Sequence, residues 1–150
     1  MPGSSSPALL RSGLLAAAAT AGVLAGFGTR FGSPWFFFQV YGREVVRVLT
    51  GALPSPSAAA AAGAVGHFVT MLLWATVYRL LLGALAPRRL AGVVGVTLSV
   101  CVLAALIQLH FLPLAAGAGS AQWLGTPRQS LYLLVLGVAL LAGTRLAERS

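Results

Sequence analysis

The segment from Ser57 to Leu82, SAAAAAGAVGHFVTMLLWATVYRLLL, is a continuous apolar run with one charged residue, Arg79, near its end. A bilayer core about 30 Å thick is crossed by roughly 20 apolar residues in a helix. The apolar residues are continuous and do not alternate with polar ones, so a helix is favoured over a strand. The segment therefore predicts a transmembrane helix.

Three further stretches of the 150-residue chain have the same character, and they run from about 8 to 28, 90 to 112 and 129 to 147. No charged residue falls in the middle third of any run, where an arginine costs about 2.5–3.5 kcal/mol on insertion scales. The first run also fits a signal peptide with Leu14–Val23 as its apolar region, but about 20 residues exceed the usual length of that region. We expect one all-α integral membrane domain, residues 1–150, with four transmembrane helices.

The composition excludes several other classes of protein. Hydrophobic residues make up 58% of the chain and charged residues 8%, whereas a soluble domain carries about 25% charged residues. The mean hydropathy is +0.90, so too few polar groups exist to cover a water-facing surface, and a disordered chain is excluded as well. The single cysteine, Cys101, argues against a disulfide scaffold.

Ten arginines stand against two acids, Glu44 and Glu148, for a net charge of +8. The arginines lie singly or in pairs between the apolar runs, which is typical of residues that flank membrane spans. The pattern favours anionic membrane lipids as partners and argues against nucleic acid. Six arginines fall on the side of the two termini and the second link, and four on the other side: Arg11, Arg79, Arg88, Arg89, Arg145 and Arg149 against Arg30, Arg43, Arg47 and Arg128. This bias predicts that both termini are cytoplasmic.

The link between the first two spans, residues 29–56, predicts an interfacial amphipathic helix. Apolar residues recur on one helical face and polar residues on the other: Phe37, Phe38, Tyr41, Val45, Val48 and Leu49 against Gln39, Arg43, Arg47 and Thr50. Glu44 is placed to pair with Arg47 at i, i+3. Such a helix lies in the membrane surface, and a role in docking a partner or in gating is the alternative.

Small residues spaced four apart allow close approach of helices in lipid. This spacing occurs in the first span at Ala18, Gly22 and Gly26, and in the later spans as the pairs Gly63/His67, Gly66/Thr70 and Gly95/Ser99. In the fourth span Ser130, Gly137 and Thr144 recur every seven residues, on one helical face. We expect these residues to pack the spans against one another, with oligomer formation as the alternative.

No catalytic constellation is recognisable in the sequence. The chain has no aspartate, neither glutamate lies inside a predicted span, and no zinc-binding spacing of Cys and His occurs. We expect no enzyme activity, no bound metal and no cofactor.

Two histidines remain, His67 in the second span and His110 near the end of the third. Histidines on neighbouring helices are able to ligate haem or a metal. If spans two and three form an antiparallel hairpin, the residue of span three at the height of His67 is Ala105. His110 lies five residues farther, or about 7 Å along the helix axis. This difference in height disfavours a haem bound by both histidines. The alternative is a neutral histidine that hydrogen-bonds inside the bundle.

Polar residues on spans two and three predict a mildly polar seam between them. The second span contributes His67, Thr70, Trp74 and Tyr78 on one helical stripe, and the third contributes Thr97, Cys101, Gln108 and His110. Interhelical hydrogen bonding is the expected role, and a cleft for a small molecule or lipid is the alternative.

The order of these features resembles a family of small four-helix bacterial inner-membrane proteins with no assigned activity. The resemblance rests on Gly66-His67-Phe68, on Trp74 to Tyr78 and on His110-Phe111-Leu112-Pro113-Leu114, and it covers residues 20–143. It implies an inner-membrane location and makes His67 and Tyr78 the positions to mutate. Such families often begin the fourth span with a histidine, where this chain has Arg128-Gln129-Ser130.

These features together favour a non-enzymatic accessory or structural subunit of a membrane complex, with a protein partner or a second copy of the chain. The alternatives are a small-molecule or lipid carrier that uses His67, Thr70 and Tyr78, and a haem- or quinone-binding redox subunit.

Overall fold

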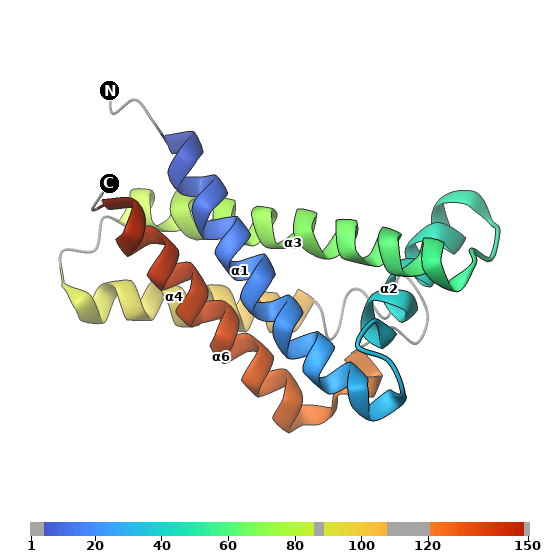
Figure 1. Ribbon diagram of the computed structural model, residues 1–150. Coiled ribbons are helices and arrows are strands. Elements are labelled where there is room, and N and C mark those ends of the chain that lie inside the picture. Colours follow the sequence, from blue (N-terminus) through green and yellow to red (C-terminus); the bar gives the residue numbers. More distant parts are fainter. Residues whose placement is uncertain (1–4, 86–88, 108–120, 149–150) are drawn as a thin grey trace.

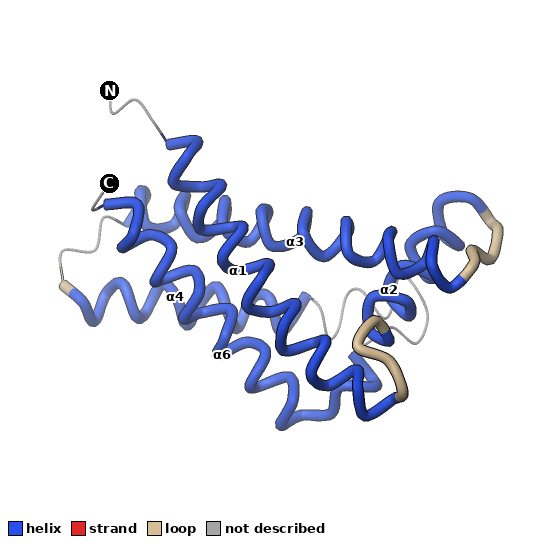
Figure 2. The backbone as a smooth tube through the Cα atoms, viewed as in Figure 1, coloured by secondary structure: helices blue, strands red, loops and turns tan. Residues whose placement is uncertain are grey.

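The computed structural model describes residues 5–85, 89–107 and 121–148. In these ranges the chain forms helices joined by short turns, without a β-strand (Figures 1 and 2). The all-α class is therefore confirmed for the described residues. The elements follow in the order α1 (Ser5–Gly28), the short 3-10 helix η1 (Thr29–Phe31), α2 (Phe36–Thr50), α3 (Pro56–Leu85), α4 (Leu90–Leu106) and α6 (Ala121–Glu148).

Three of these helices are long and apolar enough to cross a membrane. The apolar stretches are Leu9–Phe31, Pro56–Leu85 and Pro127–Arg145, close to three of the four predicted spans. The described part of α4 has 17 residues, fewer than the roughly 20 that a span needs. The predicted continuation of that span to Leu112 lies outside the described residues. The structure therefore supports three candidate spans in the described residues, and the fourth stays a prediction.

Two glycines close the turn that follows α1. A Cβ added to Gly28 would lie 2.6 Å from the Ser33 carbonyl oxygen, so a larger residue would push the turn apart. Gly32 adopts φ 87°, a left-handed conformation that glycine enters without a steric penalty. The turn lets Phe31 stack on Phe36, with ring centroids 4.6 Å apart.

α2 packs antiparallel against the first half of α3, and two glycines lie at the contact. A Cβ on Gly42 would collide with the Ala59 carbonyl oxygen, and a Cβ on Gly63 would collide with the Phe38 carbonyl oxygen. Two helix backbones approach this closely only where no side chain separates them.

The link between α2 and α3 is short and is ordered by local hydrogen bonds. Gly51 ends α2 at φ 71°, and its amide donates to the Arg47 carbonyl oxygen at 2.9 Å. The Ser55 hydroxyl then accepts a hydrogen bond from the Ala58 amide at 3.3 Å, with Pro56 at the first position of α3. Serine before the helix and proline at its first position are favoured helix starts.

The predicted amphipathic helix exists as α2, and its predicted ion pair is confirmed. Arg47 Nη2 donates to Glu44 Oε2 at 2.6 Å. The apolar face of α2 was predicted to lie in the membrane surface. In the structure Phe37 and Phe38 of this face are buried within the protein. The protein itself thus covers the first half of this face.

α1 and α6 run side by side, and α1 crosses α3 (Figure 1). A Cβ on Gly143 would lie 2.6 Å from Ser12 Cα, and a Cβ on Gly13 would lie 2.5 Å from Leu72 Cδ2. Small residues therefore allow α1 to contact both neighbours closely. The starts of α1 and α4 and the ends of α3 and α6 lie at one end of the bundle, whereas η1, α2 and the start of α3 lie at the other.

The small-residue prediction for the first span is wrong in its choice of residues. Ala18, Gly22 and Gly26 are exposed, and no atom lies within 4 Å of a Cβ built on either glycine. The spacing of small residues shows that a helix face permits close packing, but it does not identify the face that is used.

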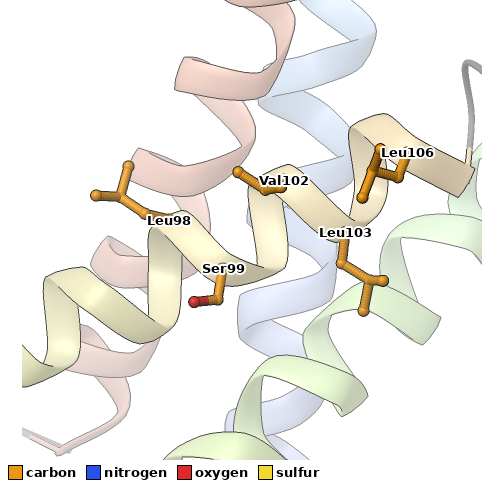
Figure 3. A pocket seen from close by; sticks show the side chains of 5 residues that line it. All are labelled: Leu98, Ser99, Val102, Leu103 and Leu106. Atoms are coloured by element: carbon orange, nitrogen blue, oxygen red, sulfur yellow. The ribbon is translucent and has the colours of Figure 1, made fainter.

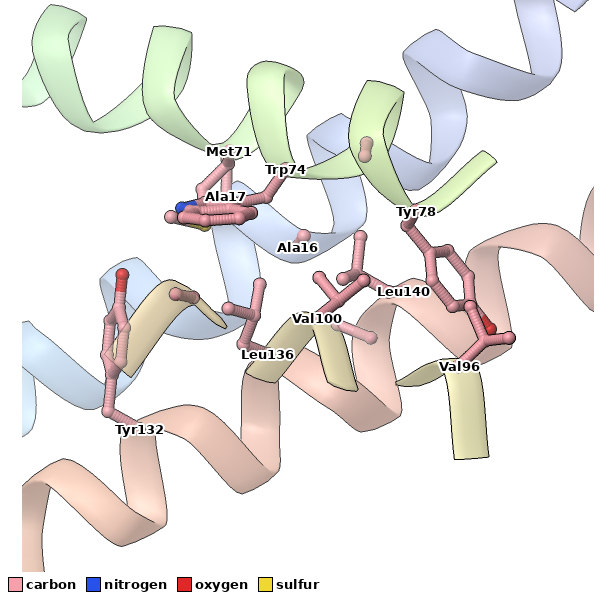
Figure 4. Packing of buried hydrophobic residues seen from close by; sticks show 13 residues of the cluster. Ala16, Ala17, Met71, Trp74, Tyr78, Val96, Val100, Tyr132, Leu136 and Leu140 are labelled. Atoms are coloured by element: carbon pink, nitrogen blue, oxygen red, sulfur yellow. The ribbon is translucent and has the colours of Figure 1, made fainter. Parts of the chain in front are cut away.

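The core lies where α1, α3, α4 and α6 meet (Figure 4). Its largest members come from three helices: Met71, Trp74 and Tyr78 of α3, Val100 of α4, and Tyr132, Leu136 and Leu140 of α6. Ala16 and Ala17 of α1 are buried among them, because only small side chains fit between the closely packed α1 and α3.

Arg128, near the start of the long segment of α6, lies over two aromatic rings from the end of α1 and from η1. Its Cζ is 5.8 Å from the Phe27 ring centroid and 5.7 Å from that of Phe31. A guanidinium within about 6 Å of an aromatic face is attracted by the negative face of the ring. This contact joins α6 to the turn after α1.

We expect Arg128→Gln to lower the free energy of unfolding by about 0.5–2 kcal/mol, because the amide has no charge to interact with the two rings. Titration with SDS, followed by tryptophan fluorescence, measures that free energy. The matched control is Arg89→Gln at the opposite end of the bundle, for which we expect a change within about 0.5 kcal/mol. Equal effects of the two substitutions would contradict the proposed contact energy.

Candidate functional site

His67 lies in the middle of α3 and is 9% exposed. Its Nε2 atom is 3.0 Å from the Thr20 hydroxyl and 3.3 Å from the Ala17 carbonyl oxygen, both on α1. The Thr20 hydroxyl donates its own hydrogen to the Ala16 carbonyl oxygen at 2.6 Å. Because a carbonyl only accepts and the Thr20 hydrogen is already used, these partners assign the hydrogen to Nε2 of His67. The histidine thus donates across the α1–α3 contact.

Aromatic side chains enclose the His67 ring on two sides. The Phe38 ring stands edge-on to it at 5.6 Å between centroids, and the Tyr132 ring lies 6.5 Å away. Phe38 reaches this position because Gly63 lets α2 approach the backbone of α3. The imidazole is therefore held by α1, α2, α3 and α6 together.

A second polar pair joins α3 to α4. The Tyr78 hydroxyl lies 2.9 Å from the Thr97 hydroxyl, which donates its hydrogen to the Val93 carbonyl oxygen at 2.9 Å. Tyr78 is therefore the donor in the pair. Both residues are buried. Hydrocarbon offers no hydrogen-bond partner, so the bond between the two hydroxyls satisfies a polar group that would otherwise be unpaired.

The other predicted seam residues have different surroundings. The Thr70 hydroxyl donates to the Gly66 carbonyl oxygen of its own helix at 2.8 Å, and Trp74 is buried in the core. Cys101 Sγ contacts the Leu133 carbonyl oxygen of α6 at 3.4 Å. Gln108 and His110 lie outside the described residues. Among the described seam residues, Tyr78 and Thr97 are brought together, whereas His67 bonds to α1.

Sequence reasoning missed Thr20, the partner of His67. The available signal was the spacing of Ser12, Ala16 and Thr20, three small residues four apart on one face of α1. The structure buries all three completely. Gly42 was missed as well, because a glycine within an amphipathic pattern does not reveal that a second helix lies against it.

These polar pairs form hydrogen bonds between helices. In residues 5–85, 89–107 and 121–148, no three side chains of His, Cys, Asp or Glu lie together as a metal site requires. The Nε2 atom of His67 and the hydroxyls of Thr20, Tyr78 and Thr97 bond to one another or to backbone carbonyls. These bonds join α1 to α3 and α3 to α4.

We expect Tyr78→Phe and Thr97→Val each to destabilise the protein and to be less than additive in combination. Interhelical hydrogen bonds in membranes contribute about 0.6 kcal/mol on average and at most about 1.7. A double-mutant cycle of SDS unfolding free energies isolates this pairwise contribution. Strict additivity would mean that the two hydroxyls do not interact.

A shallow hollow lies on the outer side of α4. It is lined by Leu98, Ser99, Val102, Leu103 and Leu106, all from one helix (Figure 3). The Ser99 hydroxyl donates to the Gly95 carbonyl oxygen of its own helix at 3.0 Å. With four aliphatic side chains and a serine that bonds to its own backbone, this surface has the character of a lipid-facing helix side.

Comparison of the chain with protein-family models, with curated proteins and with solved structures finds no match. The resemblance to small four-helix inner-membrane proteins therefore stays a prediction.

Proposed function

We propose that the chain is a four-span inner-membrane protein that acts without enzyme activity, as an accessory or structural subunit of a membrane complex. The observation that carries this proposal is that the interior polar groups form hydrogen bonds between helices. His67 and Tyr78, the residues best suited to chemistry, are both engaged in hydrogen bonds between helices. A site that acts on a substrate needs polar groups that the substrate is able to reach.

The membrane placement is supported by the outer surfaces of the candidate spans. Large aliphatic residues of α3, α4 and α6 are exposed, among them Val69, Leu73, Leu98, Leu134 and Val138. Exposure of these apolar side chains to water would be unfavourable, whereas in a bilayer they contact lipid tails of the same polarity. We include α4 as the fourth span, with α2 at the membrane boundary and both termini in the cytoplasm.

The subunit role is supported by the exposed stripe of Ala18, Gly22 and Gly26 on α1. Inside the protein, the same kind of surface at Gly13 and Gly63 is covered by a closely packed helix. A small-residue face that no helix of the described chain covers is compatible with a helix from a partner or from a second copy.

The mass of the complex extracted from native membranes in mild detergent tests this proposal. We expect a stoichiometric assembly heavier than one chain that Gly22→Leu weakens. Gly83→Leu is the matched control, because Gly83 also has no atom within 4 Å of its Cβ position. A monomer that turns over a substrate, or one that shows the visible absorption of a bound haem, would contradict the proposal.

A further inference from the structure

We propose that the end of α2 is a binding site for anionic phospholipid at the membrane surface. The site consists of the α2 tip, which is Val48, Leu49 and Leu53, together with Arg43. The inference rests on the proposed placement of α3 across the membrane.

The apolar face of α2 continues beyond the part that α3 covers. Phe38 is buried against Gly63, and Gly42 lies against Ala59. Leu49 follows Phe38 by 11 residues, which is about three helical turns, so it lies on the same face. Yet Leu49 is 77% exposed, because α3 begins only at Pro56.

The exposed end of this face forms one aliphatic surface with the turn that follows. Val48 is 62% exposed and Leu53 is 74% exposed. Singly exposed leucines are common on protein surfaces. Here three large aliphatic side chains fall within six residues at the tip of one helical hairpin. Such a surface requires an apolar contact.

The connection to α3 favours lipid as that contact. Only residues 51–55 separate α2 from α3, so the tip lies where the span leaves the bilayer. The 30 residues of α3 extend about 45 Å, longer than a hydrocarbon core of about 30 Å. Tilt accommodates the excess length, and α3 crosses α1 at an angle in the bundle (Figure 1). The tip therefore remains near the membrane surface.

The charge at this end favours anionic headgroups. The elements at this end contain four arginines and one acid: Arg30 of η1, Arg43, Arg47 and Glu44 of α2, and Arg128 of α6, which lies over the Phe31 ring. Arg47 already pairs with Glu44, and the only other acid of the chain, Glu148, ends α6 at the opposite end. Arg43 is exposed on the polar side of the same helix. A lipid phosphate supplies the negative charge that this end of the protein lacks.

Fluorescent labelling in lipid nanodiscs tests the site. In a Cys101→Ser background, Leu53→Cys carries an environment-sensitive fluorophore, and nanodiscs contain phosphatidylcholine with phosphatidylglycerol. We expect quenching by lipids brominated near the headgroup end of the acyl chain to exceed quenching by lipids brominated near the methyl end. Leu49→Cys is the second labelling position, in case labelled Leu53→Cys does not fold.

Leu73→Cys, an exposed position in the middle of α3, separates the two proposals. Quenching of a label at Leu73 but not at Leu53 would overturn the lipid site and leave the membrane placement intact. Absence of quenching at both Leu73 and Leu53 would overturn the proposed membrane placement as well as the lipid site. A tip label that lipid does not quench but a native protein complex shields would identify a protein partner and also overturn the lipid site.

The preference for anionic lipid is tested by brominating one lipid at a time. We expect brominated phosphatidylglycerol to quench the tip label more than an equal amount of brominated phosphatidylcholine. Arg43→Gln should reduce that preference by up to about fivefold, the effect of one arginine near an anionic surface. Arg89→Gln at the opposite end is the matched control and should leave the preference unchanged. Equal quenching by both lipids in the unsubstituted tip would overturn the anionic specificity.

Discussion

Gly63→Ala is expected to cause one of the largest losses of stability that a single added methyl group produces in the described helices. The new methyl group would overlap the Phe38 carbonyl oxygen and lie 2.9 Å from Phe38 Cα. Both obstacles are backbone atoms, which have no rotamer to change, so α2 as a whole has to move away from α3. Overpacking usually costs about 1–3 kcal/mol, and we expect a loss of about 3 kcal/mol or more in the free energy of unfolding by SDS.

The control for this substitution is Gly95→Ala in α4. No atom lies within 4 Å of its Cβ position, so the methyl group meets no obstacle. Alanine is also favoured over glycine in a helix interior by about 0.5–1 kcal/mol. We therefore expect Gly95→Ala to be neutral or slightly stabilising. If Gly63→Ala were equally neutral, the close contact of α2 with α3 would be wrong.

His67→Ala is expected to produce the second large loss of stability. The substitution removes the hydrogen bonds to Thr20 and Ala17, and it removes the ring that contacts Phe38 and Tyr132. An interhelical hydrogen bond contributes about 0.6–1.7 kcal/mol, and truncation of a large buried side chain costs about 2–5 kcal/mol. We expect a total of about 3 kcal/mol in SDS unfolding. His67→Phe, which keeps the ring, should lose only the hydrogen-bond part.

Two threonine variants isolate the hydrogen bond of His67 from its packing. Thr20→Val preserves shape and removes the acceptor, so we expect a loss of about 1 kcal/mol. Thr70→Val is the matched control on α3, because the Thr70 hydroxyl bonds only to the Gly66 carbonyl oxygen of its own helix. If the two threonine variants were equally stable, the bond between α1 and α3 would not contribute to stability.

Most helices could be predicted from the sequence because the signal for them is local. Apolar runs of span length, such as Ser57–Leu82, make helices favourable in lipid whatever lies next to them. The Glu44–Arg47 ion pair was equally predictable, since residues three apart are neighbours on any helix. Local rules also explain two helix ends, because serine is favoured before a helix, as at Ser55, and glycine is favoured where a helix ends in a left-handed conformation, as at Gly51.

The surroundings of the candidate site were not predictable in the same way. The sequence placed His67 and Tyr78 on one helix face and predicted that this whole face packs against the third span. In the structure Tyr78 bonds to Thr97 of α4, whereas His67 bonds to Thr20 of α1. Because α3 crosses its neighbours, one face contacts different helices along its length.

The sequence by itself determined that this is an all-helical protein whose long segments suit a membrane, because the transfer of apolar residues and the pairing of backbone groups depend on each segment alone. The tertiary structure decided which surfaces are covered. It placed α2 against Gly63, left Gly22 and Leu49 uncovered, and gave His67 its partner on α1. The physical reason is that the polar stripe of α3 indicates a buried face but not the helix that covers it, and α4 is apolar on almost all sides. Close contacts between backbones, and the few hydrogen bonds that these contacts permit, then select one arrangement.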